Sequence, residues 1–152
     1  MASPRIVDFN ELETLVGEEI GVSDWVVIDQ ERVNKFAEAT GDFQWIHVDV
    51  ERATKEIGSP IAHGFLTLSI LPLLSPQVLK VESVSRGINY GTNKVRFTNM
   101  VPVGSRIRLN QKCLSVEPKS GGRQMISQNT IEIEGQDRPA MVSENISVLY
   151  GY

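Results

Sequence analysis

The segment from Phe65 to Leu74 constrains the fold more than any other part of the chain, because it is apolar on nearly every side of a helix. A helix with this pattern is enclosed by protein instead of lying on a surface. It is too short to cross a bilayer, which needs ~20 residues, so no membrane span is expected. Pro72 lacks a backbone donor, which predicts a kink or the end of the regular helix there. The rest of the chain must therefore provide a surface that covers this helix.

The second half of the chain provides that surface, because its residues alternate with the period of strands. One face carries Ile107, Leu109, Gln111 and Cys113, and the other carries Arg106, Arg108, Asn110 and Lys112. Two further strands are expected over 125–134 and 140–150, with Val142, Ile146, Val148 and Tyr150 on one face of the latter. Upstream, Ile88 and Tyr90, then Val95 and Phe97, add one or two more strands.

Short turns at 120–122 and 135–137 join consecutive strands, which predicts an antiparallel sheet. A sheet with one apolar face must cover it, and the Phe65–Leu74 helix is the obvious cover. We therefore predict an α+β fold in which a curved antiparallel β-sheet wraps around a central α-helix. No repeat or linker interrupts residues 1–152, so a single domain is expected.

The first half of the chain is predicted to contain helices and loops. Asp29 is expected to cap a helix that runs to Thr40, and Gly41 suits the left-handed residue that ends it. A short helix over 8–16, a short strand over 25–28 and a second helical stretch over 50–57 complete this half.

Composition narrows the class of protein further. The 152 residues carry a formal net charge of −4, which argues against a nucleic-acid-binding surface. The single cysteine, Cys113, cannot form an intrachain disulfide, which fits a reducing compartment. Residues 1–10 are polar and mixed, without a secretory pattern. We expect a soluble, cytoplasmic protein.

Asp42 and His47 form the most informative pair of polar residues. They are five positions apart, which would point them away from each other on a continuous helix. Because Gly41 ends the helix first, the pair lies in a turn, where a carboxylate and an imidazole can share one water and take its proton. The alternative interpretation is structural: Asp42 bonds to local amides, and His47 is a buried histidine with satisfied hydrogen bonds.

A second candidate site is His63-Gly64, at the start of the apolar helix. Backbone N–H groups are unpaired at a helix start, so the Gly64 N–H could stabilise negative charge on a thioester oxygen. The alternative is that Gly64 permits a close approach of sheet to helix. His63 could act as a second acid or shape the loop.

A metal site is not expected. His47 and Asp49 could begin one, but the chain has only two histidines and no further ligand cluster is evident. Cys113 lies in an alternating strand without a matched base, which favours burial over nucleophilic chemistry.

These residues resemble the MaoC-like (R)-specific enoyl-CoA hydratases, in their nodulation-protein-N-like branch. The family motif runs aromatic, small residues, Gly-Asp, any residue, Asn-Pro, aliphatic, His, with a second His-Gly some sixteen residues later. Here it reads Phe36, then Thr40-Gly41-Asp42, then Gln44-Trp45-Ile46-His47, then His63-Gly64. Two further stretches, 89–97 and 102–105, also resemble that branch. Gln44-Trp45 replaces Asn-Pro, which leaves the acyl-chain preference open.

The resemblance implies a hot-dog fold and a lyase that hydrates trans-2-enoyl-CoA with R stereochemistry or dehydrates the product. It implies Asp42 and His47 as the catalytic pair and the Gly64 N–H as the donor to the substrate carbonyl. No cofactor is implied; the expected partners are an acyl-CoA or acyl-carrier thioester substrate and a second copy of the chain, in a homodimer.

Two other functions fit the same fold, since one scaffold hosts many chemistries. The first is an acyl-CoA thioesterase, whose sequence patterns are not those of Asp42, His47 and His63-Gly64. The second is a non-catalytic acyl-thioester-binding accessory protein, which would be expected to have lost one member of the pair.

Overall fold

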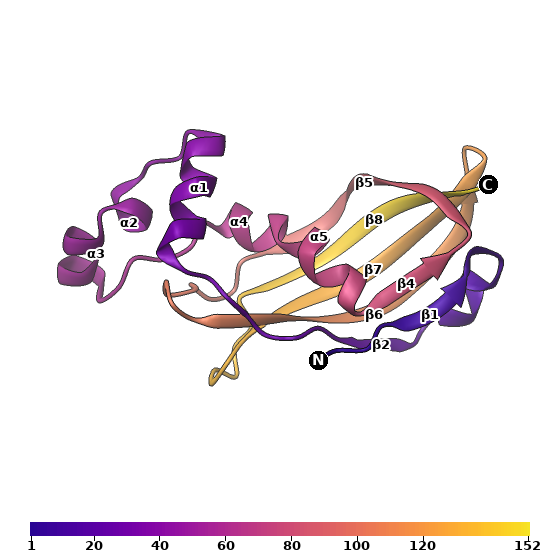
Figure 1. Ribbon diagram of the computed structural model, residues 1–152, viewed down its shortest axis with the longest axis horizontal. Helices are drawn as coiled ribbons and strands as arrows, with labels where there is room; N and C mark the ends of the chain where they lie inside the picture. Colours follow the sequence, from indigo (N-terminus) through magenta and orange to yellow (C-terminus); the bar gives the residue numbers. More distant parts are fainter.

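The computed structural model describes residues 1–152 and has the predicted α+β architecture (Figure 1). Its helices are α1 (Gln30–Thr40), α2 (Trp45–Val48), α3 (Val50–Ile57), α4 (Gly64–Ser69) and α5 (Leu71–Leu74), with 3-10 turns at Phe9–Leu15 and Ser75–Gln77. Its strands are β1 (Arg5–Asp8), β2 (Glu19–Val22), β3 (Val26–Val27), β4 (Leu79–Glu82), β5 (Val84–Arg96), β6 (Arg106–Lys119), β7 (Gly122–Ile133) and β8 (Met141–Gly151).

The main sheet is antiparallel and has the strand order β2-β6-β7-β8-β5, with β3 also pairing with β6. The predicted turns at 120–122 and 135–137 join β6 to β7 and β7 to β8. One long strand, β5, occupies the region where one or two strands were expected. It pairs with β8, so the chain crosses the sheet between β5 and β6, an order that the turns alone did not reveal.

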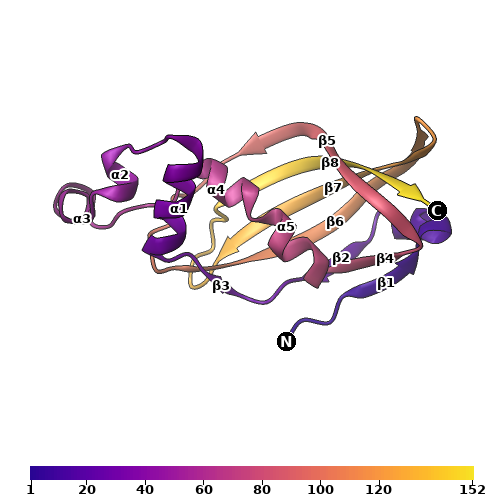
Figure 2. The same cartoon turned by 45° about the horizontal axis from the view of Figure 1, so that its top comes forward.

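Helices α4 and α5 cross one face of this sheet, while α1, α2 and α3 group at one end (Figures 1 and 2). Leu66, Ile70, Leu71 and Leu74 of the central segment are buried in a core cluster of 21 residues. The segment is not enclosed on every side, however, because Phe65 and Leu73 are exposed. Ser69 and Pro72 are exposed as well, so the expectation of complete enclosure was wrong for this side of the segment.

The central segment is two short helices where one helix with a kink or end at Pro72 was expected. The regular pattern stops at Ser69, and Ile70 lies between the two helices. Pro72 lies in the first turn of α5, where a missing N–H costs nothing. The break comes before the proline because Pro72 cannot donate to the carbonyl of Leu68 four residues earlier.

Helix α1 confirms the predicted capping. The Asp29 carboxylate accepts a hydrogen bond from the Arg32 N–H at 2.9 Å. Gly41 ends the helix with a φ of 81°, in the left-handed region that favours glycine. The chain therefore turns sharply at the point where Asp42 begins.

The inward face of β6 is the predicted one, since Ile107, Leu109, Gln111 and Cys113 are all buried. For β8, the expected apolar face was wrong in part: Val148 is buried, but Val142, Ile146 and Tyr150 are only partly buried, and Met141 and Ser143 of the other face are buried. Polar residues therefore occupy part of the inward face of this strand.

Other features have no counterpart in the sequence predictions, among them β2, which pairs with β6. β1 and β4 form a separate parallel pair, and Ile61 makes an isolated bridge to Pro102. None of the helices has the length and apolar character needed to cross a membrane.

Candidate active site

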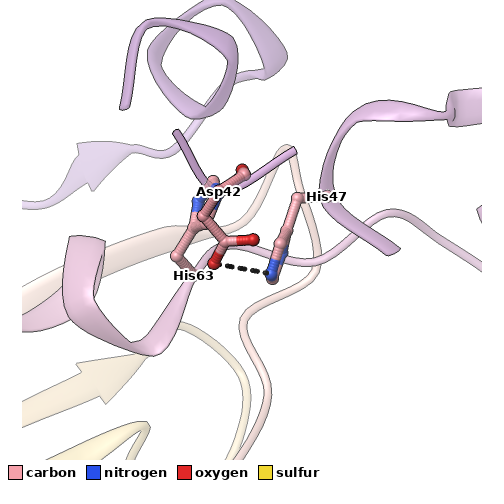
Figure 3. A group of neighbouring side chains, drawn as sticks. All are labelled: Asp42, His47 and His63. Atoms are coloured by element: carbon pink, nitrogen blue, oxygen red, sulfur yellow. Dashed lines mark hydrogen bonds and ion pairs between the residues drawn. The ribbon is translucent and has the colours of Figure 1, made fainter. Parts of the chain in front are cut away.

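The turn after α1 and the short helix α2 bring Asp42 and His47 together. Asp42 Oδ2 and His47 Nε2 are 4.0 Å apart (Figure 3). The His47 side chain is 7% exposed, whereas that of Asp42 is 49% exposed. The predicted convergence of the two residues is therefore present, with the imidazole inside and the carboxylate at the surface.

The hydrogen bond of His47 fixes which ring nitrogen carries the proton. Nδ1 lies 2.7 Å from the Ile61 carbonyl oxygen, which can only accept. Nδ1 therefore donates, and in the neutral ring Nε2 is left with a free lone pair directed towards Asp42. This is the tautomer that a general base needs on the side facing the carboxylate.

The environment of His47 lowers its pKa below the usual 6.5. Burial is the main cause, because it disfavours the charged ring. The hydrogen bond to Ile61 opposes this shift, neighbouring His63 adds to it, and the Asp42 carboxylate opposes it. The net effect favours the neutral imidazole.

Asp42 also makes the local contact that the structural interpretation predicted. Its Oδ1 accepts a hydrogen bond of 3.3 Å from the Gln44 N–H. One carboxylate oxygen thus stabilises the turn, while Oδ2 faces His47. Asp49, by contrast, caps α3 by accepting from the Arg52 N–H at 3.1 Å, which explains its presence without a role in a site.

His63 takes part in the site through the backbone of Asp42. Its Nε2 lies 3.0 Å from the Asp42 carbonyl oxygen, so Nε2–H donates there. The ring also stacks on that of His47, with centroids 3.8 Å apart and planes 25° apart, and contacts Phe36. His63 is 2% exposed. His63 therefore has the structural role that one interpretation suggested. Through its hydrogen bond to the Asp42 carbonyl, it holds the turn that carries Asp42.

Asp42, His47 and His63 together are a cluster of three possible metal ligands, with ligand atoms within 4.8 Å of one another. The sequence pointed instead to His47 and Asp49 as the start of a metal site, and this grouping of three was not expected. His63 Nε2–H donates to the Asp42 carbonyl, whereas His63 Nδ1 is buried without a hydrogen-bond partner. The cluster thus offers at most three protein ligands, fewer than the four of a structural zinc site.

Gly64 borders a pocket of about 400 Å³ together with His47, Thr67 and Phe97. The Gly64 N–H has no backbone partner, as expected for the first residue of a helix. A Cβ at this position would lie 2.9 Å from Cδ2 of Phe97. Gly64 is thus closely packed, but against a side chain that follows β5 and not against the sheet that the steric interpretation named.

The Gln44-Trp45 departure from the family motif is compatible with the local backbone. Trp45 is the first residue of α2, a position where proline is favoured because no N–H is needed there. The Arg52 guanidinium lies over the Trp45 ring, 4.0 Å from its centroid. The tryptophan therefore packs against α3 where the family has a proline.

A family model described as MaoC-like domain matches residues 11–134. The chain belongs to the MaoC-like domain family. It is 51% identical over 138 residues to 3-hydroxyacyl-thioester dehydratase Z of Mycobacterium tuberculosis, covering 90% of this chain and 91% of the relative. It is 38% identical over 146 residues to nodulation protein N of Rhizobium meliloti, covering 93% and 91%.

Among solved structures, the MaoC-like domain is similar to the R-hydratase PhaJ1 from Pseudomonas aeruginosa. The TM-score is 0.73 at 20% identity, over 90% of this chain and 83% of that one. This likeness establishes the hot-dog fold, a curved antiparallel sheet around a central helical segment. The family resemblance inferred from the residues is therefore confirmed.

Proposed function

We propose that the protein adds water to trans-2-enoyl thioesters to give (3R)-3-hydroxyacyl thioesters, or runs the reverse dehydration. Its family membership and the name of its 51% identical relative support this reaction class. The observation that carries the proposal is the 4.0 Å separation of Asp42 Oδ2 and His47 Nε2. His47 and Gly64 border the same pocket.

Asp42 and His47 are proposed to hold one water between them. Two acceptors 4.0 Å apart can each receive a hydrogen bond of about 2.8 Å from the same water. Both water protons then point at the protein, and the oxygen lone pairs point away from it, towards C3 of the substrate. The arrangement orients the water and provides a base for its proton.

The proposed step balances as follows. The water oxygen bonds to C3 while one O–H bond breaks and its proton passes to the Asp42–His47 pair. The electron pair of the C2–C3 double bond moves towards the thioester oxygen, giving an enolate. Return of the proton to C2 restores the thioester, so that H and OH have been added across the double bond. Dehydration is the same sequence in reverse.

The enolate oxygen is proposed to accept a hydrogen bond from the Gly64 N–H. This N–H is without a backbone partner, and Gly64 and His47 border the same pocket. A donor placed where charge develops stabilises the transition state more than the ground state.

The test is to mix the purified protein with a short trans-2-enoyl-CoA and follow enoyl absorbance, free thiol and product chirality. The proposal predicts loss of absorbance without thiol release and a 3R product. Release of free thiol would indicate a thioesterase, and no change with any enoyl-CoA would indicate a non-catalytic protein; either result contradicts the proposal. Acyl-carrier thioesters are tested in parallel, because the carrier is left open.

A homodimer is part of the proposal and is supported by the edge of the sheet. β5 is the last strand in the order and pairs only with β8, so its outer backbone groups are available to another strand. Ile88 and Tyr90 on this strand are exposed, as is Phe65 at the start of α4. Sedimentation at micromolar concentration should give twice the chain mass of 16.9 kDa, and a monomer would contradict the pairing.

We also propose that residues 1–152 act as one domain in the cytoplasm. One hydrophobic cluster draws residues from Val7 to Met141, and Cys113 is buried as a free thiol. A free thiol is typical of a reducing compartment. Cell fractionation with an antibody against the protein would test the location.

A further inference from the structure

A band of polar residues crosses the inward face of the sheet. Gln111 of β6 lies opposite Asn129 of β7, which lies opposite Ser143 of β8. These residues are 5%, 3% and 1% exposed, respectively. The neighbouring row is apolar and consists of Leu109, Ile131 and Met141. Burying polar side chains beside such a core costs free energy unless they are hydrogen-bonded, so the band calls for an explanation.

Most of the polar atoms in the band satisfy one another. Gln111 Nε2 donates to Asn129 Oδ1 at 2.9 Å, and Asn129 Nδ2 donates to Asn145 Oδ1 at 3.0 Å. The Ser143 hydroxyl donates to the same Asn145 oxygen. Gln111 Oε1 is buried and has no hydrogen-bond partner. If the whole run of amides is reversed, the free atom of Gln111 becomes an N–H donor. In either orientation one polar side-chain atom of Gln111 has no hydrogen-bond partner.

The open atom belongs to a residue that borders a cavity of about 690 Å³. The cavity is also bordered by α4, α5 and strands β4 to β8, and Asn129, Asn145 and Ser127 contribute polar atoms to it. Its apolar lining includes Leu68, Leu71 and Met125. This combination suits a mostly apolar ligand that carries one hydrogen-bonding group.

Helix α4 borders both this cavity and the pocket of the proposed reaction site. Thr67 borders the pocket of His47 and Gly64, and the next residue, Leu68, borders the larger cavity. Leu68 is four residues beyond Gly64, about 6 Å along the helix axis. A thioester held at Gly64 would therefore reach the cavity with carbons of its acyl chain that are well beyond C3.

We propose that the cavity binds acyl chains that carry a hydroxyl group distant from the thioester, and that Gln111 binds this hydroxyl; the inference rests on the function proposed above. A hydroxyl both donates and accepts, so it satisfies Gln111 in either amide orientation. A plain hydrocarbon chain leaves the buried amide atom unpaired, which weakens its binding. The preferred substrates are thus hydroxylated acyl thioesters.

The test measures binding by calorimetry, so that it does not depend on turnover. The ligands are octanoyl-CoA, analogues with a hydroxyl at each carbon from C5 to C8, and methyl-branched analogues of the same size. At least one hydroxylated ligand should bind about tenfold more tightly than both the plain and the methyl-branched chain. Equal binding of the plain chain, or equal binding of the methyl-branched one, would overturn the proposal.

Two variants assign the effect to Gln111. Gln111→Met keeps the length of the side chain and should reduce the hydroxyl preference to about one. Met125 borders the same cavity but does not belong to the polar band. The Met125→Leu variant should therefore keep the preference for hydroxylated ligands. A preference that survives Gln111→Met would overturn the role of Gln111, and the wild-type comparison decides the proposal even if that variant does not fold.

Enoyl-CoA hydration measured alongside separates the two proposals. Hydration without a hydroxyl preference contradicts the inference about the cavity alone. A hydroxyl preference without hydration contradicts the proposed hydratase reaction, but it still supports the binding of hydroxylated acyl chains in the cavity.

Discussion

The rings of His47 and His63 stack with their centroids 3.8 Å apart, and each ring holds a different part of the site. The His47 ring donates a hydrogen bond to the Ile61 carbonyl, and the His63 ring donates one to the Asp42 carbonyl. The two histidines thus connect the loop before α4 to the turn that carries the carboxylate.

His63→Phe is predicted to keep the stacked ring while removing the hydrogen bond to Asp42. We expect kcat/KM to fall about tenfold, since a hydrogen bond that positions a catalytic group is lost. The pKa of His47 should rise, because His63 contributes to lowering it. The acid limb of the pH profile should therefore move to higher pH. An unchanged profile, with unchanged kcat/KM, would show that His63 only fills space.

The pH dependence of the wild-type protein follows from His47. Because burial lowers its pKa below 6.5, the neutral base form persists as the pH falls through that value. Activity should stay level down to about pH 6.5 and decline only in more acidic solution. NMR titration of the ring should give a midpoint below 6.5. In Asp42→Asn the midpoint should fall further, because the carboxylate raises the His47 pKa. A wild-type midpoint above 6.5 would contradict the environment described.

Gly64→Ala is predicted to act through Phe97. The new methyl group would lie 2.9 Å from Cδ2 of Phe97, so the ring must move. Because the Phe97 ring is 44% exposed and can turn towards solvent, we expect a loss of at most about 1 kcal/mol in the free energy of unfolding, measured in urea. Adding Phe97→Leu should recover much of this loss. A double variant no more stable than Gly64→Ala alone would place the cause elsewhere.

The parts of the fold with local signals were predictable from the sequence. Asp29 and Gly41 mark the ends of α1 because capping depends on neighbouring residues. The alternation around Leu109 identified the buried face of β6 because three of its four residues are apolar, whereas the four on the other side are polar. The convergence of Asp42 and His47 also had a local signal, because only five positions separate them from each other and a helix-ending glycine separates them from α1.

Features formed by distant residues carried no such signal. Arg5–Asp8 pairs in parallel with Leu79–Glu82, and no turn joins two strands so far apart. The inward face of β8 was misassigned because it carries polar residues where a core was expected: Ser143 is buried, and Asn145 borders a cavity. The bond from His63 to the Asp42 carbonyl spans 21 residues and depends on how α4 meets the turn.

Asp42→Asn and His47→Ala should each reduce kcat/KM for enoyl-CoA hydration about a hundredfold or more, while the fold is kept. Asparagine can accept the Gln44 N–H but cannot take a proton from water. Asp49→Asn is the matched control, because asparagine caps α3 as well as aspartate does and Asp49 has no part in the proposed chemistry. Near-normal turnover by folded Asp42→Asn would make Asp42 structural.

The central claim is that Asp42 and His47 act on one water, and the double variant tests it most directly. Groups that act as a unit do not multiply their effects. The kcat/KM of Asp42→Asn/His47→Ala should therefore be close to that of the more damaged single variant, in the same assay and with thermal unfolding as the check on folding. A loss equal to the product of the two single losses would show that the residues act in separate steps, and would contradict the shared water between Oδ2 and Nε2.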